Sequence, residues 1–207
     1  MVPPLFLDVK PHHRVLDMCA APGSKTQQLL EAIHFADDKL GQQQLPTGFV
    51  VANDADYKRC SLLTHQTKRV CSPCLLVTNH SAELFPEIRK KLPNGEVESL
   101  SFDRILADVP CSGDGTMRKS PDIWKRWSVA SGNGLHLIQL RIALQGAKVL
   151  KVGGRMVYST CTFNPIENEA VVAELLLRCK GALEVSLAMS LAYNPRPYTS
   201  CCWLLSF

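Results

Sequence analysis

The amino-acid sequence predicts an α/β protein with a doubly wound fold, in which helices cover both faces of a mostly parallel sheet. Short β-rich runs alternate along the chain with longer segments of helical periodicity, which is the order that strand–helix–strand units produce. The β-rich runs are continuously apolar, as is typical of strands that are buried on both faces. The chain has 207 residues, 46% of them apolar, which suffices for one domain with a hydrophobic core.

Strands and helices alternate in this way up to about residue 183. The expected strands are residues 14–18, 49–53, 75–78, 104–107 and 155–158. The expected helices are residues 24–35, 57–70, 135–150 and 167–179, and Gly153-Gly154 is expected to end the third of them. Residues 184–207 show no strand pattern of the right length, so we expect the sheet to lack its last strands.

Composition excludes several classes of protein. The 23 Lys and Arg against 19 Asp and Glu leave a net charge of +4, and this mild excess permits a nucleic-acid partner without arguing for one. The balance of charged and apolar residues excludes a disordered tail, a fibrous repeat and a coiled coil. No apolar run reaches the length of about 18 residues that a membrane span needs. The nine cysteines are an odd number and no secretory signal precedes them, so we expect reduced thiols in the cytosol or nucleus.

The segment after the first strand, Asp17-Met-Cys-Ala-Ala-Pro-Gly-Ser-Lys25, has the features of a ligand-binding turn. Pro22 and Gly23 permit a tight turn, small Ala20 and Ala21 let a ligand approach the main chain, and the following helix presents free N–H groups. An ordinary strand-to-helix turn would look similar. The segment lacks the glycine spacing of both the nicotinamide fingerprint and the P-loop, so phosphate binding is not expected.

Two carboxylates follow the second strand and invite different interpretations. Asp54 comes directly after the strand, where a carboxylate is placed to accept the two hydroxyls of a ribose. Asp56 precedes the second helix and suits its N-cap. We therefore expect Asp54 to bind a ligand and Asp56 to cap the helix.

A cysteine follows each of the last two predicted strands. Cys111 lies in Asp108-Val-Pro-Cys-Ser-Gly-Asp-Gly-Thr116 and Cys161 in Ser159-Thr-Cys-Thr-Phe-Asn-Pro165. A single cysteine is usually a small buried apolar residue. Two of them at the matching ends of neighbouring strands indicate chemistry, and a disulfide between them is disfavoured by the reducing compartment.

A second group of cysteines has a weaker pattern. Cys71-Ser-Pro-Cys74, with Cys60 and His65 upstream, resembles part of a zinc site, but a second close pair of ligands is missing. We interpret the segment as a turn and expect no metal.

Three segments carry a family resemblance. Asp17 to Lys25, Asp108 to Gly115 and Tyr158-Ser-Thr-Cys-Thr-Phe-Asn-Pro-Ile-Glu-Asn-Glu169 together resemble the NSUN-type (Sun-domain) RNA cytosine-5 methyltransferases. The chain is most similar to the branch that acts on tRNA, and Ala52 to Asp56 and Thr116 to Trp124 fit it too. The resemblance runs from residue 2 to about residue 183, so residues 1–183 are expected to form a Rossmann-like catalytic domain and residues 184–207 a divergent tail.

This resemblance implies transfer of a methyl group from S-adenosylmethionine to C5 of cytosine in RNA, with tRNA as the expected substrate. By resemblance, Cys161 is the nucleophile that adds to C6 and Cys111 helps to release the product. Asp108 would bind the edge of the base. The implied cofactor contacts are Cys19, Ala20, Ala21, Pro22, Gly23, Ser24, Lys25, Asp54 and Asp108.

The sequence also departs from the family pattern. Ser81 stands where such enzymes carry an acidic residue that contacts the adenine amino group. The family match leads us to expect a chain truncated at both ends and marginal in stability. The alternative function is therefore a catalytically impaired fragment that only binds cofactor or RNA. We further expect a monomer without membrane association, in the nucleus or nucleolus, with the cytoplasm as the alternative.

Overall fold

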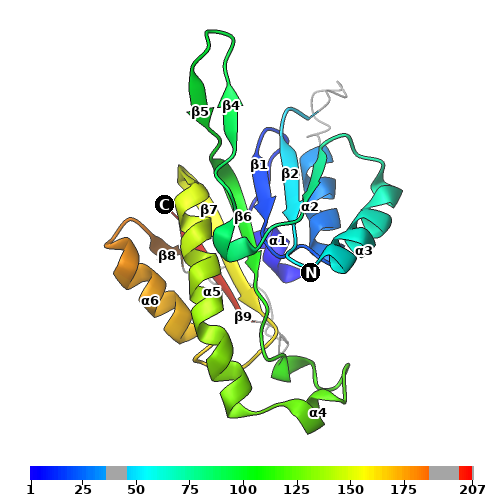
Figure 1. The fold of residues 1–207 in the computed structure, drawn as a ribbon, viewed down its shortest axis with the longest axis vertical. Helices are drawn as coiled ribbons and strands as arrows, with labels where there is room; N and C mark the ends of the chain where they lie inside the picture. The colour runs from blue at the N-terminus through cyan, green and yellow to red at the C-terminus, as the bar shows by residue number, and fades with distance from the viewer. Residues whose placement is uncertain (36–45, 187–200, 207) are drawn as a thin grey trace.

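The computed structural model describes residues 1–35, 46–186 and 201–206, and its centre is a seven-stranded sheet of order β3-β2-β1-β6-β7-β9-β8 (Figure 1). The pairs β1–β2, β1–β6, β2–β3 and β6–β7 are parallel, while β9 runs antiparallel to both β7 and β8. The strands are β1 (Arg14–Asp17), β2 (Phe49–Asn53), β3 (Leu75–Thr78), β6 (Phe102–Asp108), β7 (Leu150–Thr160), β8 (Glu184–Ser186) and β9 (Cys201–Ser206).

Helices cover both faces of this sheet, as the apolar strands predict. They are α1 (Val2–Phe6), α2 (Ser24–His34), α3 (Tyr57–Thr67), α4 (Ile123–Arg126), α5 (Val129–Val149) and α6 (Glu169–Cys179), with short 3-10 turns η2 (Lys68–Val70), η3 (Ala82–Leu84) and η4 (Asp114–Thr116). Successive strand residues point to opposite faces. Val15 of β1 packs in the core beside Leu29 of α2, whereas Leu16 packs in the core beside Ile142 of α5.

The five predicted strands and four predicted helices are confirmed, with shifted ends. β6 and β7 are longer than predicted, and α5 begins at Val129 because Ser128 caps it by accepting a hydrogen bond from the Ser131 N–H. Gly153-Gly154 does not end α5, because β7 already begins at Leu150 and contains both glycines. A Cβ on Gly154 would lie 2.7 Å from the Lys151 carbonyl oxygen, so this irregular start of β7 needs a glycine.

The expectation that the sheet lacks its last strands is wrong. β9 pairs with β7 over six positions, from Arg155 opposite Ser206 to Thr160 opposite Cys201, and β8 adds a further strand. Leu204 and Leu205 enter the cores on opposite faces of the sheet, so β9 contributes to both cores. Residues 187–200 of the predicted tail lie outside the described residues.

A short hairpin was missed by the sequence analysis. It consists of β4 (Arg89–Lys91) and β5 (Val97–Ser99), and it projects from the end of the sheet at which β6 begins (Figure 1). All six strand residues are exposed, so no core pattern marks them. The signal that could have found the hairpin is Asn94-Gly95, a common hairpin turn in which Gly95 has a φ of 87°.

Gly48 provides a test of the packing before β2. Its N–H donates to the Pro11 carbonyl at 2.8 Å, and a Cβ on it would overlap the backbone of His13. We expect Gly48→Ala to cost about 1–3 kcal/mol and to lower the melting temperature by about 3 °C or more. Gly134→Ala is the control, because a Cβ there meets nothing within 4 Å and α5 gains helix propensity. Equal melting temperatures for the two variants would contradict this account.

Candidate active site

The loop between β1 and α2 is held in place by the end of β2. The Ala20 N–H donates to the Asn53 carbonyl at 2.8 Å, and the Ala21 N–H donates to Asp54 Oδ2 at 3.1 Å. The Arg59 guanidinium of α3 donates to the Ala21 carbonyl at 2.6 Å. The predicted ligand-binding loop is therefore pinned to a neighbouring strand and helix before any ligand arrives.

Gly23 permits the tight turn of this loop, as expected. Its φ of 112° lies in the left-handed region, and a Cβ would lie 2.9 Å from Leu63 Cδ1 of α3. The glycine therefore permits both the turn and the close contact with α3, and the second of these was not predicted. No side chain caps the first turn of α2 after Gly23, so the helix does present backbone N–H groups there, as predicted.

The two carboxylates after β2 have different contacts, and the prediction for Asp56 is confirmed. Asp56 Oδ1 accepts the Arg59 N–H at 2.9 Å, which confirms it as the cap of α3. Asp54 is buried, and its two oxygens accept the N–H groups of Ala21 and Asp56. The structure thus gives Asp54 a role in shaping the loop, and its contact with a ribose stays a prediction.

Asp17 is a buried acid beneath the same loop. Its Oδ2 accepts a hydrogen bond from the Thr26 hydroxyl at 2.7 Å. Its Oδ1 is buried with no hydrogen-bond partner among the residues that the structure describes. Burial raises the pKa of Asp17 to about 7. A buried acceptor without a donor is a place where a polar or cationic group would be stabilised.

Asp108 and Lys25 connect the loop after β1 to the end of β6. Lys25 Nζ lies 2.6 Å from Asp108 Oδ2, and the Ser159 hydroxyl donates to Asp108 Oδ1 at 2.7 Å. The Lys25 and Asp108 side chains are 24% and 30% exposed, so a ligand can reach this ion pair. The ion pair therefore connects the carboxyl ends of β6 and β7 to the helix that follows β1.

The two predicted cysteines lie side by side as free thiols, with their sulfur atoms 3.3 Å apart. A hydrogen bond from the Cys111 thiol lowers the pKa of Cys161, against the opposing effects of burial and of Asp108, and Lys25 also favours the charged form. The same interaction and burial raise the pKa of Cys111. The directions of these pKa shifts favour Cys161 as the thiolate of the pair, which is the ionisation state that a nucleophile requires.

Glu167 was missed as a site residue by the sequence analysis. It is fully buried, and Oε1 accepts the Ser112 N–H at 2.8 Å and the Gln139 amide at 3.0 Å. Oε2 accepts the Ser112 hydroxyl at 2.5 Å and the Thr162 hydroxyl at 3.2 Å. Ser112 follows Cys111 and Thr162 follows Cys161, so one carboxylate holds both cysteine loops. The sequence signal was its place in the Ile166-Glu-Asn-Glu169 segment, six residues after Cys161.

Other predicted features take no part in the hydrogen bonds around the two cysteines. Ser81 precedes η3, and the Asn79 amide ties the end of β3 to the Asp54 carbonyl at 2.8 Å. Burial raises the pKa of Cys19, which disfavours its thiolate. Within the described part of the chain, no group of three or more His, Cys, Asp or Glu could hold a metal ion. None of the described helices has both the length and the apolar character to cross a membrane.

Two adjacent cysteines at the carboxyl edge of a doubly wound sheet are the distinctive feature of this site, and comparison with known proteins identifies the family that carries it. Residues 4–191 match the family model described as 16S rRNA methyltransferase RsmB/F. The chain belongs to this family, so the resemblance noted from the motifs is confirmed.

Two curated relatives are highly similar over most of the chain. It is 55% identical to the tRNA (cytosine(34)-C(5))-methyltransferase of Drosophila melanogaster, covering 94% of this chain and 26% of the relative. It is 59% identical to the multisite-specific tRNA:(cytosine-C(5))-methyltransferase of Saccharomyces cerevisiae, covering 85% of this chain and 25% of the relative. The chain therefore spans about a quarter of the length of these relatives.

Solved structures confirm the Rossmann-like fold. The crystal structure of PH0851 is similar with a TM-score of 0.81 and 26% identity, covering 100% of this chain and 45% of that one. The structure of NSun6 from Pyrococcus horikoshii with SFG has a TM-score of 0.77 and 21% identity, covering 99% and 50%, and supports the fold alone.

Removal of the Cys111 thiol tests the ionisation of the pair. Since Cys111→Ala cannot donate a hydrogen bond, we expect the pKa of Cys161 to rise, so that its thiolate forms at higher pH. The rate at which iodoacetamide alkylates Cys161 is followed by peptide mass spectrometry over a pH series. The midpoint of this rate against pH should shift to higher pH. Cys71→Ala, at the turn before β3, should leave the profile unchanged. A midpoint that does not move in Cys111→Ala would show that the pair is not coupled as described.

Glu167→Ala tests the buried carboxylate. The variant leaves the Ser112 N–H without its acceptor and removes one of the two acceptors of the Gln139 amide, and we expect a loss of at least about 2 kcal/mol of stability. The variant should also raise the pH midpoint of Cys161 alkylation, which the loss of a purely structural residue elsewhere in the fold would not change. Glu169→Ala is the matched control, because Glu169 is exposed. Retention of the Cys161 profile in Glu167→Ala would refute the positioning role.

Proposed function

We propose that this chain methylates C5 of cytosine in RNA, with tRNA as the substrate and S-adenosylmethionine as the methyl donor. The observation that carries the proposal is the Cys111–Cys161 pair, in which Cys161 is the favoured thiolate beside the Asp108–Lys25 ion pair. The tRNA assignment is supported by the names of the two curated relatives.

The residues of the loop after β1 fit the proposed cofactor. S-adenosylmethionine carries a sulfonium and an ammonium group, and Asp17, Asp54 and Asp108 surround the loop with carboxylates. Asp17 Oδ1 is a buried acceptor that the ammonium group, which is a hydrogen-bond donor, would satisfy. The uncapped start of α2 suits an anionic or electron-rich part of the ligand. When bound, the cofactor supplies an electrophilic methyl group.

The residues of this chain would then act in sequence. C5 of cytosine is a poor nucleophile, and addition of the Cys161 thiolate to C6 would convert C5 into an enamine carbon that can bond to the methyl group as the methyl–sulfur bond breaks and the sulfonium becomes a neutral thioether. Asp108 accepts a hydrogen bond from the exocyclic amino group of the base and helps the ring to carry the developing charge. The C5 proton then leaves, the pair of electrons re-forms the C5–C6 double bond, and the Cys161 sulfur departs with help from Cys111.

The target cytosine must be outside a stacked helix, since C6 is not accessible within one. A monomeric state and a location in the nucleus belong to the same proposal and rest on the family resemblance.

Two cysteine variants separate the steps of this mechanism. Cys161→Ala should abolish methyl transfer, because no adduct with C6 forms. Cys111→Ala should accumulate a covalent protein–RNA complex, because release of the product fails. Both are measured on a denaturing gel after incubation of the chain with tRNA and S-adenosylmethionine. A trapped complex in Cys161→Ala would reverse the assignment, and no complex or product in any variant would favour a fragment that only binds its ligands.

A further inference from the structure

The segment between η4 and α5 carries a concentration of positive charge. Residues 117–127 hold four basic side chains and one acidic one, whereas the whole chain has a net charge of only +4. The basic residues are Arg118, Lys119, Lys125 and Arg126. All four are exposed, and none forms an ion pair with any residue in the described ranges. We call residues 117–127 the basic segment.

An aromatic side chain stands among these charges. Trp124 of α4 is 73% exposed, and Phe163, in the loop after Cys161, is 58% exposed. Large exposed aromatic rings are costly in water and are enriched at binding surfaces. Aromatic rings interleaved with cations are typical of surfaces that bind single-stranded nucleic acid, where bases stack on the rings and phosphates contact the cations.

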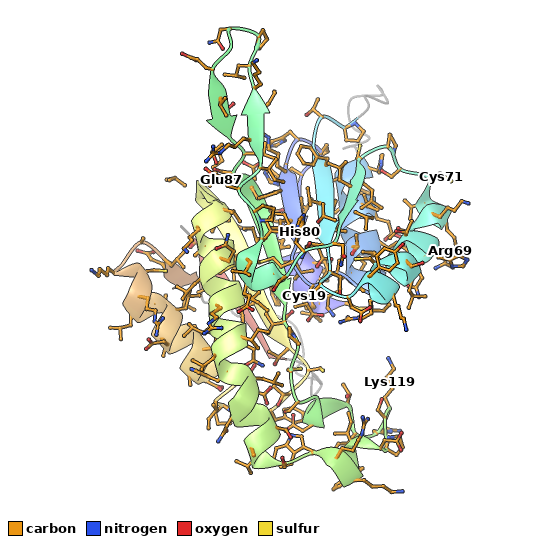
Figure 2. All side chains as sticks on the ribbon, in the orientation of Figure 1. Cys19, Arg69, Cys71, His80, Glu87 and Lys119 are labelled. Carbon is orange, nitrogen blue, oxygen red and sulfur yellow. The ribbon has the colours of Figure 1, made fainter. Side chains whose placement is uncertain are left out.

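The basic segment is joined to the catalytic cysteines. The position that a Cβ of Gly113 would occupy lies 3.5 Å from Ile123 Cδ1 of α4 and 3.9 Å from Cys161 Sγ. The Gly115 N–H donates to the Cys161 carbonyl at 3.1 Å, and the Phe163 N–H donates to Asp114 Oδ1 at 2.8 Å. Figure 2 shows Lys119 in the lower part of the view, with Cys19 between it and the β4–β5 hairpin at the top.

We propose that the basic segment binds the single-stranded RNA next to the target cytosine. Trp124 stacks on a neighbouring base, and Arg118, Lys119, Lys125 and Arg126 contact the phosphates. A cytosine that has left its stack also releases its neighbours from full stacking, so a base is available for the indole. The inference rests on the proposed function, because it names the surface that holds that substrate.

The test measures binding of a fluorescein-labelled single-stranded RNA oligonucleotide that contains cytosine, by fluorescence anisotropy at several salt concentrations. Trp124→Ala should weaken binding about 5- to 100-fold, the usual contribution of one stacked base. Lys119→Gln with Lys125→Gln should reduce the slope of log K against log salt by about 1.4, since each phosphate contact contributes about 0.7 for a single strand.

The control is Lys90→Gln with Lys91→Gln, which removes the same charge from the β4–β5 hairpin at the other end of the sheet and should leave the slope unchanged. A thermal melt confirms that each variant is folded, which is expected because the substituted side chains are exposed. A wild-type chain that does not bind the oligonucleotide, or equal effects of the segment and hairpin variants, would overturn the inference.

Failure of the proposed function gives a different result. If the oligonucleotide binds through Trp124 but neither methyl transfer nor an adduct occurs, the binding surface stands and the catalytic proposal fails. If methyl transfer proceeds normally in Trp124→Ala with unchanged RNA affinity, the catalytic proposal stands and this inference fails.

Discussion

The buried carboxylate of Glu167 is the constraint on which the geometry of the site depends. Its Oε2 accepts the Ser112 and Thr162 hydroxyls, so the residues next to both cysteines are fixed to the same acceptor. A carboxylate buried without a cation is costly unless its lone pairs are satisfied, and here hydroxyl, amide and backbone donors satisfy them. The resulting 3.3 Å separation of the sulfurs lets one thiol donate to the other, and this makes Cys161 and Cys111 chemically different.

The parallel sheet supplies the framework for this arrangement. Because β1, β2, β6 and β7 run in the same direction, the ends of all four strands lie at one edge, and the loops that follow them can share hydrogen bonds. Asp54 and Arg59 hold the loop after β1, and the Lys25–Asp108 pair joins that loop to β6. β9 pairs with the edge of β7 that lies opposite β6. The strand that Cys161 directly follows is therefore internal to the sheet.

The sequence predicted the strand ends and the two cysteines because local patterns mark them. Apolar runs identify β1, β2, β6 and β7, and the functional residues directly follow these runs. β9 was not predicted, since a run of five apolar residues, Cys201 to Leu205, fits several structures until a partner strand is known. Glu167 was not predicted as a site residue either, because its partners Ser112 and Gln139 are 55 and 28 residues away. The close contact of Gly23 with Leu63 was not predicted for the same cause, because Leu63 belongs to α3, 40 residues further along the chain.

The central claim is that Cys161 attacks a cytosine in RNA so that C5 receives the methyl group. It is tested most directly by incubating the chain with tRNA and S-adenosylmethionine labelled in the methyl group, digesting the RNA and identifying the labelled nucleoside by mass spectrometry. The account predicts the label in 5-methylcytidine with the wild-type chain and none with Cys161→Ala. Label in any other nucleoside, or undiminished 5-methylcytidine with Cys161→Ala, would contradict it.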